Sequence, residues 1–393
     1  MKIIKINKLI PIVMAGSLLL TLAAGCAASE TNGSESAAET VLSAADDNDP
    51  DITYDREDSQ VIDISEETDV TISEGGTFII TGETSDGSIT VDAGDEEVQL
   101  VLRDVSLTCS DSSAITVLSS GGVSVILEGN NYLANGGQFV NDSDEAIDAV
   151  VYSKDDLTVS GEGSLEISSP AGHGIVCKDE MVITDGTYSV DTLEDGINVN
   201  DSLLITGGTF TMNAGDDAFH TDGVLSITGG IFDITAAEGL EGTEIVIDGG
   251  EITIAATDDG INAAQKTEDM DVFVEINGGT IVITMGQGDT DGIDSNGDIT
   301  INGGTVDITG MSAIDYDGTA ALTGGTLIVN GSQTDTIPNQ ETGGGMAPGG
   351  GTLGGGEKPG EPPAGEVPVA GSSDGGPQGQ PPAGDPPQGG YPG

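Results

Sequence analysis

Apolar and polar residues alternate along most of the chain, in short segments that end at glycine. The segment Thr209 to Met212, with the sequence TFTM, is typical: Phe and Met fall on one side and Thr on the other. Period-two alternation over four to six residues is typical of a β-strand with one buried face. A helix is disfavoured because glycine interrupts every candidate window and β-branched residues fill the rest. The pattern therefore predicts an all-β protein.

The predicted strands belong to an internal repeat. A tripeptide of a polar, a small and an apolar residue recurs at intervals of 22, 22, 21, 21, 32 and 21 residues. The long interval contains an insertion around Ala264 to Asp271. The copies begin at His173, Asp195, Asp217, Glu238, Asp259, Asp291 and Ser312. From the second copy on, each is followed by a Gly-Gly element headed by Ile205, Ile227, Ile247, Ile276, Ile301 or Leu322.

A repeat of this length predicts one turn of a solenoid. Glycines at fixed offsets permit the positive-φ corners between strands, and stacked turns place like residues in columns. Ile205 and Ile227 would then lie in one inward column. A sandwich or a propeller is the alternative, but 22 residues are too few for a four-stranded blade of about 40. We expect a right-handed parallel β-helix with roughly eleven or twelve turns.

The two ends of the chain differ from this repeat. Residues 1–25 have the layout of an export signal, and their apolar run of about fourteen residues is too short for a membrane span of about twenty. Residues 26–51 are polar, and we expect them to form a disordered tether. We assign residues 52–335 to the β-helix. Residues 336–393 are a Gly/Pro-rich tail that we expect to be disordered.

The residues before Cys26 resemble the lipobox of bacterial lipoproteins, although Ala23 stands where leucine is usual. This resemblance implies a lipid on Cys26, and an ordinary signal peptide is the alternative. We expect a monomer on the extracellular face of the bacterial cell membrane, which touches the membrane only through that lipid.

The charge of the chain excludes one class of partner and favours another. There are 68 Asp and Glu against nine Lys and Arg, which gives a formal net charge of −59. Nucleic acid is excluded as a partner because phosphate binding needs basic patches. Divalent cations become natural partners. No Cys/His cluster suits zinc, and Cys109 and Cys177 fall at different phases of the repeat, so we expect two buried thiols.

Three stretches carry a resemblance to a known family: Val70 to Leu107, Tyr152 to Ile167, and the repeated DGI followed by ITGG. They resemble the bacterial carbohydrate-binding domain-containing proteins. The resemblance implies a parallel β-helix similar in shape to calcium-dependent pectate lyases, with bound calcium and affinity for cellulose and polygalacturonate.

Acidic residues form a column at the start of each repeat. Stacked about 4.8 Å apart, two carboxylates at an effective dielectric near 20 repel by about 3.5 kcal/mol, so a partly buried column needs a cation or raised pKa values. Oxygen ligands suit calcium. A solvated turn residue is the alternative for each single acid. The candidate metal ligands are Glu194, Asp195, Asp216, Asp217, Asp258, Asp259, Asp289, Asp291 and Asp294.

Carbohydrate would be bound by residues beside this column. Lys154 and Lys178 occur in similar contexts about one turn apart and would contact sugar carboxylates; Asn198 and Asn262 belong to a second polar column. The chain has no Trp, and its tyrosines share no phase of the repeat, so an acidic glycan bridged by calcium is preferred to neutral cellulose.

We expect a non-catalytic polysaccharide-binding protein. A calcium-dependent pectate lyase is the first alternative, but the acids that follow each lysine would raise the pKa of a catalytic base. A structural or adhesive rod is the second alternative.

Overall fold

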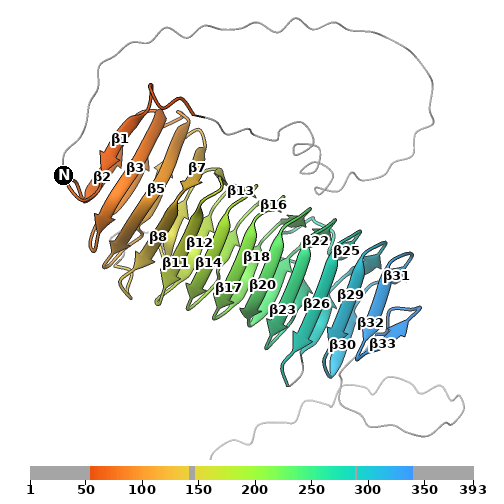
Figure 1. Ribbon diagram of the computed structural model, residues 1–393. Helices are drawn as coiled ribbons and strands as arrows, with labels where there is room; N and C mark the ends of the chain where they lie inside the picture. The colour runs from red at the N-terminus through yellow and green to blue at the C-terminus, as the bar shows by residue number, and fades with distance from the viewer. Residues whose placement is uncertain (1–53, 141–146, 288–289, 340–393) are drawn as a thin grey trace, which may run out of the picture. The chain divides into compact units, whose positions relative to one another are not determined.

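The computed structural model describes residues 54–140, 147–287 and 290–339. These residues contain 33 strands and no helix. Nearly all of the strands pair in parallel with strands one repeat away, so the chain coils into a solenoid (Figure 1). The predicted parallel β-helix, with a repeat of about 22 residues, is confirmed.

One sheet of eleven strands forms the first face of the solenoid, called face 1. Each turn contributes one strand to it, and the tripeptide of the repeat lies at its start. The strands are β2 (Asp69–Ile72), β4 (Ser88–Asp92), β6 (Ile115–Ser119), β9 (Ala149–Ser153), β12 (His173–Cys177), β15 (Ile197–Val199), β18 (Asp217–Thr221), β21 (Glu238–Gly242), β24 (Ile261–Ala263), β27 (Asp291–Ser295) and β30 (Ser312–Tyr316).

A second sheet of 22 strands covers the other two faces, because β3 (Gly76–Thr84) and β5 (Val98–Cys109) are long enough to belong to both. Face 2 contains β1 (Gln60–Asp63), β7 (Val123–Glu128), β10 (Leu157–Ser160), β13 (Glu180–Ile183), β16 (Ser202–Ile205), β19 (Val224–Ile227), β22 (Glu244–Ile247), β25 (Phe273–Ile276), β28 (Asp298–Ile301) and β31 (Ala320–Leu322).

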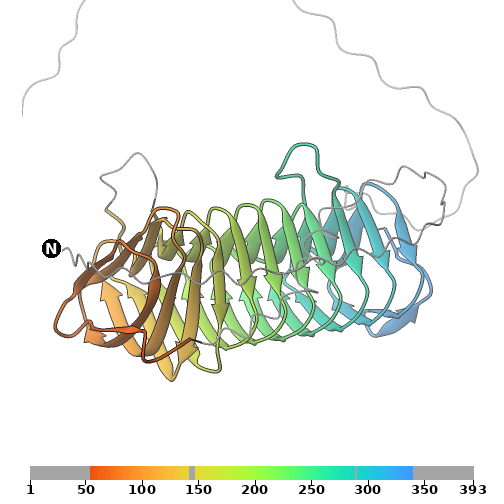
Figure 2. The ribbon, with the colours of Figure 1, turned by 90° about the horizontal axis from the view of Figure 1, so that it is seen from above.

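Face 3 follows face 2 in every turn. It contains β8 (Asn130–Asn135), β11 (Ser164–Ser169), β14 (Thr187–Thr192), β17 (Thr209–Ala214), β20 (Ile231–Ala236), β23 (Glu251–Ala256), β26 (Thr280–Met285), β29 (Thr305–Thr309) and β32 (Thr326–Val329). The strand β33 (Ser332–Thr334) pairs antiparallel with β32 and ends the row. Figure 2 shows the turns lying one beside the next.

The core consists of vertical columns of apolar side chains. Ile205 is in register with Ile227, and Ile227 with Ile247, as the repeat predicts. All three are fully buried. Burying an isoleucine stabilises a fold by about 1.5 to 3 kcal/mol, and each of these side chains is buried largely by its neighbours in the next turns.

An aromatic stack continues the core under face 3. The rings of Tyr188 and Phe210 are stacked at 4.7 Å between centroids, and those of Phe210 and Phe232 at 4.8 Å. Phe219 of β18 meets Phe210 edge-on at 5.7 Å. Tyr188 therefore packs in the core and presents no ring to the surface.

The Gly-Gly corners need glycine for two different reasons. A Cβ on Gly207 would lie 2.5 Å from the carbonyl oxygen of Thr184 in the preceding turn. Gly208 has a φ of +105°, which residues with a β-carbon rarely adopt. The corner between faces 2 and 3 thus fixes where each turn bends.

Both described cysteines, Cys109 and Cys177, are buried free thiols, as predicted. Burial raises the pKa of Cys177 to about 12. No helix among the described residues is long and apolar enough to cross a membrane. The signal segment, Cys26, the tether and all but the first four residues of the tail lie outside the described part of the chain.

Candidate functional site

Two polar columns run along face 1. The first contains the acids that begin the repeats, and Asp217 is in register with Glu238. The second lies three residues further along each strand, and its members pair from one turn to the next: Asn198, His220, Glu241, Asn262, Asp294 and Asp315. The predicted vertical stacking of these polar residues is confirmed.

At the first turns of these columns, the side chains of Asn198 and His173 provide polar partners for the Asp195 carboxylate. Asn198 donates a hydrogen bond from Nδ2 to Asp195 Oδ2 at 2.7 Å, and His173 Nδ1 lies 3.2 Å from the same oxygen. Burial would raise the pKa of Asp195, but these two partners outweigh it and keep the pKa below its usual value. Glu194 turns to the other side of the ring, 2.9 Å from His173 Nε2.

The next turns contain a buried cluster of opposite charges. His220 Nδ1 lies 2.9 Å from Asp217 Oδ2 and 2.5 Å from Glu241 Oε2. Burial opposes the charged imidazolium, but the two carboxylates prevail and raise the pKa of His220 to about 10. The same contact holds the pKa of Glu241 below its usual value against the effect of burial, whereas burial raises that of Asp217. His220 is therefore protonated at neutral pH.

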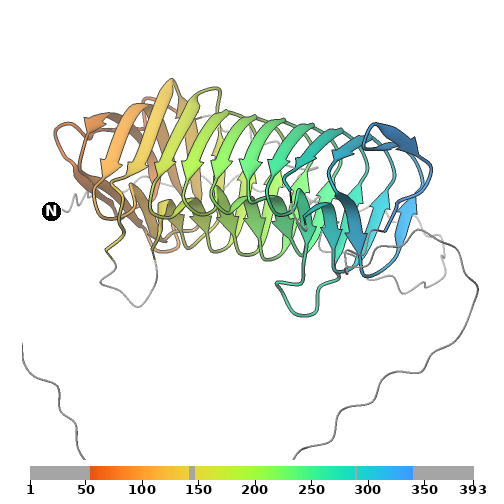
Figure 3. The same ribbon diagram turned by 90° about the horizontal axis from the view of Figure 1, so that it is seen from below.

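Lys266 completes this cluster from the insertion. Its Nζ forms an ion pair with Glu241 Oε1. The loop that carries it projects from the row of turns between β24 and β25 (Figures 2 and 3) and is fastened twice. The Lys266 amide donates to Thr243 Oγ1 and the Thr267 hydroxyl to the carbonyl of Asp222, both at 3.0 Å. The repeat pattern marked this loop only as an interruption, and nothing in that pattern indicated that the loop would reach Glu241.

Further along, the acids lack such partners. Burial, followed by repulsion from neighbouring acids, raises the pKa of Glu238 to about 8, that of Asp259 to about 7 and that of Asp294 to about 6. None of the three forms an ion pair with a described Lys, Arg or His. The acidic column is therefore divided: its first turns are neutralised by the chain, and its later turns are not.

The later turns fit a hard divalent cation. Asn262 Nδ2 donates to Glu238 Oε2 at 3.0 Å, but its buried Oδ1 has no hydrogen-bond partner. An unpaired buried carbonyl oxygen among carboxylates is an available ligand of the kind calcium prefers. Asn262 bonds Glu238 and is in register with Asp294, so these residues and Asp259 of the same turn are candidate ligands. The acids whose ligand atoms gather within 4.8 Å of those of Glu238 are Asp217 and Glu241.

The remaining predicted ligands are divided between exposed turns and hydrogen bonds. Asp216 and Asp258 are exposed beside the column. Asp291 accepts a hydrogen bond from the Ser312 hydroxyl and donates its amide to Asp259 Oδ1 at 2.8 Å. Asp289 lies outside the described residues.

Lys154 and Lys178 follow residues that are in register, Ser153 and Cys177, so they occupy equivalent places in successive turns, as predicted. Lys178 Nζ donates to Asn200 Oδ1 at 3.4 Å.

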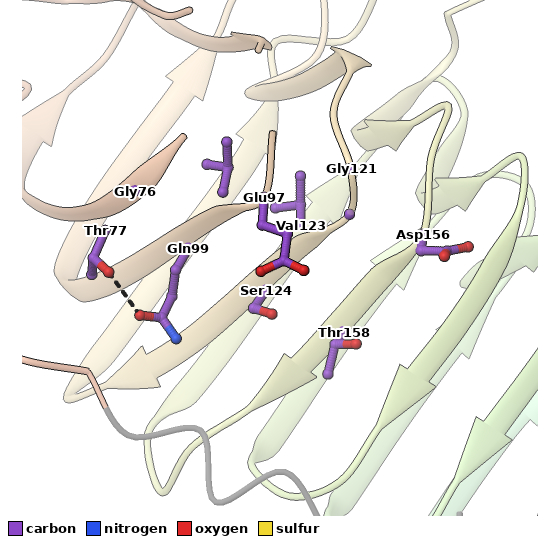
Figure 4. A pocket seen from close by; sticks show the side chains of 11 residues that line it. Gly76, Thr77, Glu97, Gln99, Gly121, Val123, Ser124, Asp156 and Thr158 are labelled. Atoms are coloured by element: carbon purple, nitrogen blue, oxygen red, sulfur yellow. Dashed lines mark hydrogen bonds between the residues drawn. The ribbon is translucent and has the colours of Figure 1, made fainter. Parts of the chain in front are cut away.

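A separate polar depression lies on face 2 (Figure 4). Its floor is a row of uncharged polar side chains in register, Thr77, Gln99, Ser124 and Thr158, and its volume is about 380 Å³. Thr77 Oγ1 donates to Gln99 Oε1 at 2.9 Å, and Glu97 and Asp156 stand at the rim. Such a surface suits hydroxyl groups, but it has no aromatic ring.

Comparison with known proteins gives a family. The model of the carbohydrate-binding domain-containing proteins matches residues 66–238 and 220–346. The chain belongs to this family. A comparison with curated proteins gives no match.

Among solved structures, the chain is similar to a polysaccharide lyase-like protein from C. thermocellum, solved as a gadolinium derivative. The two are 25% identical with a TM-score of 0.40, and the match covers 69% of this chain and 96% of that one.

Proposed function

We propose that this protein binds an acidic polysaccharide through calcium held on face 1, without chemical change to the polymer. The observation that carries the proposal is the buried, unpartnered Oδ1 of Asn262. It belongs to a stretch of the column where the carboxylates of Glu238, Asp259 and Asp294 are partly buried and have no described cationic partner. The family supports a carbohydrate partner, and a calcium ion would supply positive charge to which a uronate carboxylate binds.

The chain itself would contribute three things to binding. The partly buried carboxylates would fix the position of the ion, Asn262 would add a neutral oxygen, and the open sheet would leave one side accessible to a polymer. Lys154 and Lys178 would meet further sugar carboxylates several turns away. The cationic groups of the buried cluster, His220 and Lys266, both form ion pairs with Glu241. Either group would have to break its ion pair before it could act as the base of a pectate elimination. We therefore prefer binding to lyase activity.

Retention on polygalacturonate tests the proposal. The full-length protein should bind at pH 8 with calcium, and excess chelator should release it. Asp259→Asn should weaken calcium-dependent retention about tenfold or more, because a partly buried charged ligand is lost. Asp258→Asn is the matched control, since Asp258 is an exposed acid next to it, and it should bind like the wild type.

Three outcomes would overturn the proposal. Retention that chelator leaves unchanged would remove calcium from it. Absence of retention under all conditions would favour a structural rod, and accumulation of unsaturated uronides would make the protein a lyase.

We further propose that a lipid on Cys26 tethers the protein outside the cell. Cys26→Ser should move the protein from the membrane fraction to the medium. Unchanged fractionation of this variant would contradict the tether.

A further inference from the structure

The histidine at the start of β12 has carboxylates from both neighbouring turns beside it. His173 Nε2 lies 2.9 Å from Glu194 Oε2, which belongs to the following turn. Asp148 comes from the preceding turn, and one ligand atom from each of these three residues lies within 4.8 Å of the other two. The repeat places Asp195 and Asp217 at the position of His173 in the next turns. An imidazole therefore replaces an acid at this turn of the first column.

The main chain holds these three residues at one corner of the solenoid, where face 3 ends and face 1 begins. The His173 amide donates to the carbonyl of Asp148 at 2.8 Å, and the Glu194 amide donates to the carbonyl of Gly172 at 3.3 Å. The backbone of each turn is thus bonded to the turn before it at this corner. The His173 side chain is 17% exposed and that of Glu194 is 48% exposed, so an ion from solvent has access to both.

The other ring nitrogen fixes the orientation of the imidazole. His173 Nδ1 lies 3.2 Å from Asp195 Oδ2 and 3.1 Å from the Asp195 amide nitrogen, which donates to Nδ1 when that nitrogen carries no proton. When Nδ1 is protonated, it donates to Asp195 Oδ2 and leaves the lone pair of Nε2 for a ligand. Asp195 is only 4% exposed. A carboxylate behind a histidine is common at metal centres, where it fixes the ring and makes it more basic.

The charge around this ring is not balanced by the chain. Burial lowers the pKa of His173, but Asp195, Asp148 and Glu194 outweigh it and raise the pKa. Even a protonated ring leaves three carboxylates against one imidazolium, a net charge of −2. None of the described Lys or Arg residues forms an ion pair with Asp148 or Glu194. A divalent ion in place of the proton would bring the local charge closer to zero.

The donor set selects the kind of ion. Calcium prefers oxygen ligands alone, whereas one imidazole nitrogen with two carboxylates suits zinc and other divalent ions of the first transition series. Zinc bonds of about 2.0 Å separate the ligand atoms of a tetrahedral site by about 3.3 Å, close to the 2.9 Å between His173 and Glu194. Three protein ligands leave a fourth position for water. The sequence has no Cys/His cluster of the zinc type, because these ligands come from three different turns.

We propose that Asp148, His173 and Glu194 bind a divalent transition-metal ion, for which zinc is the best fit, and that this ion fastens three successive turns of the solenoid. Asp195 is a positioning residue that orients His173 from the other side of the ring. The inference goes beyond the proposed function, because it depends neither on carbohydrate nor on the calcium residues, which begin at Glu238, two turns after Glu194. Glu194 is one of the acids assigned to calcium from the sequence, but the imidazole beside it changes the preferred ion.

Calorimetric titration of the full-length protein with zinc chloride tests the site. Excess calcium is present throughout, because it saturates any site that takes oxygen ligands alone. The wild type should bind zinc at one tight site. Glu194→Gln should lower the affinity about tenfold or more, because it removes a charged ligand, and His173→Gln should lower it at least as much. Glu166→Gln, which removes an exposed acid from face 3, should bind zinc like the wild type.

Thermal unfolding provides an independent readout. Zinc should raise the melting temperature of the wild type, because it binds the folded protein, and should leave that of His173→Gln unchanged. Without metal, Glu194→Gln should melt close to the wild type because Glu194 is exposed, so its weaker zinc binding reports the loss of a ligand and not of the fold. Equal zinc affinity of the wild type and the two ligand variants, or displacement of zinc by excess calcium, would overturn the proposal.

Discussion

At the scale of single residues, the acids of face 1 differ by what lies beside them. Asp195 has Asn198 and His173 as partners, and Glu241 has His220 and Lys266. Glu238 has only the amide of Asn262. Residues that look equivalent in the repeat thus have pKa values displaced in opposite directions, and only those without a cation of their own need one from solution.

Replacing Lys266 tests the neutralised half of the column. Lys266→Met should lower the free energy of unfolding by about 2 kcal/mol, because Glu241 stays buried with one cationic partner fewer. Lys178→Met should change it by less than about 0.5 kcal/mol, since Lys178 is exposed. Chemical denaturation measures both, and equal effects of the two substitutions would contradict a special role for the insertion.

The acids of the later turns should make the melting temperature depend on pH. Because the pKa values of Glu238, Asp259 and Asp294 are about 8, 7 and 6 in the folded protein, the folded state binds more protons than the unfolded state between about pH 4 and 8. In chelator, the melting temperature should therefore fall as pH rises through that window. The pKa values of Asp195 and Glu241 are lowered in the folded protein, so these two acids make the melting temperature rise with pH. Their effect falls below about pH 4, outside this window.

Calcium and one substitution provide the controls for this prediction. Calcium should restore the melting temperature at pH 8 and have little effect at pH 4, where the ligands are protonated. Glu238→Gln should flatten the pH dependence in chelator. A melting temperature that rises from pH 5 to 8 in chelator would refute the raised pKa values.

At the scale of elements, each strand is stabilised by the same position of the strands in the turns on either side. Ile227 lies between Ile205 and Ile247, and alternation places its neighbours on β19 alternately inside and outside. The short strands, three to six residues in most turns, have no core of their own. Column packing is therefore the main source of stability.

Two isoleucines of neighbouring strands test this account. Ile227→Ala should cost about 3 kcal/mol, because Ile227 is fully buried in a column. Ile231→Ala should cost less than about 0.5 kcal/mol, because the Ile231 side chain is 52% exposed on face 3. Similar losses in denaturation experiments would mean that the columns contribute little.

At the scale of the whole molecule, the repeat makes the number of turns adjustable. Residues 202–223 form one complete turn, and Ser202 is in register with Val224. Deleting them should leave a folded solenoid with the same circular dichroism per residue, because β13 can pair with β19 in the same register. Deleting only residues 202–212 should abolish cooperative unfolding, because half a turn puts the wrong faces together.

The sequence alone determined the fold, because period-two alternation and glycines at a constant spacing are local signals repeated many times. It also placed the polar columns and the equivalence of Lys154 and Lys178. It missed the cationic partner that Glu241 finds in Lys266, since that contact depends on an insertion that the repeat does not encode.

Tertiary structure decided which acids are paired. Lys266 belongs to an insertion outside the repeat, and only the folded loop brings it to Glu241, 25 positions earlier in the chain. Periodicity specifies which face a residue occupies, but burial and charge at that face depend on side chains supplied by distant parts of the chain.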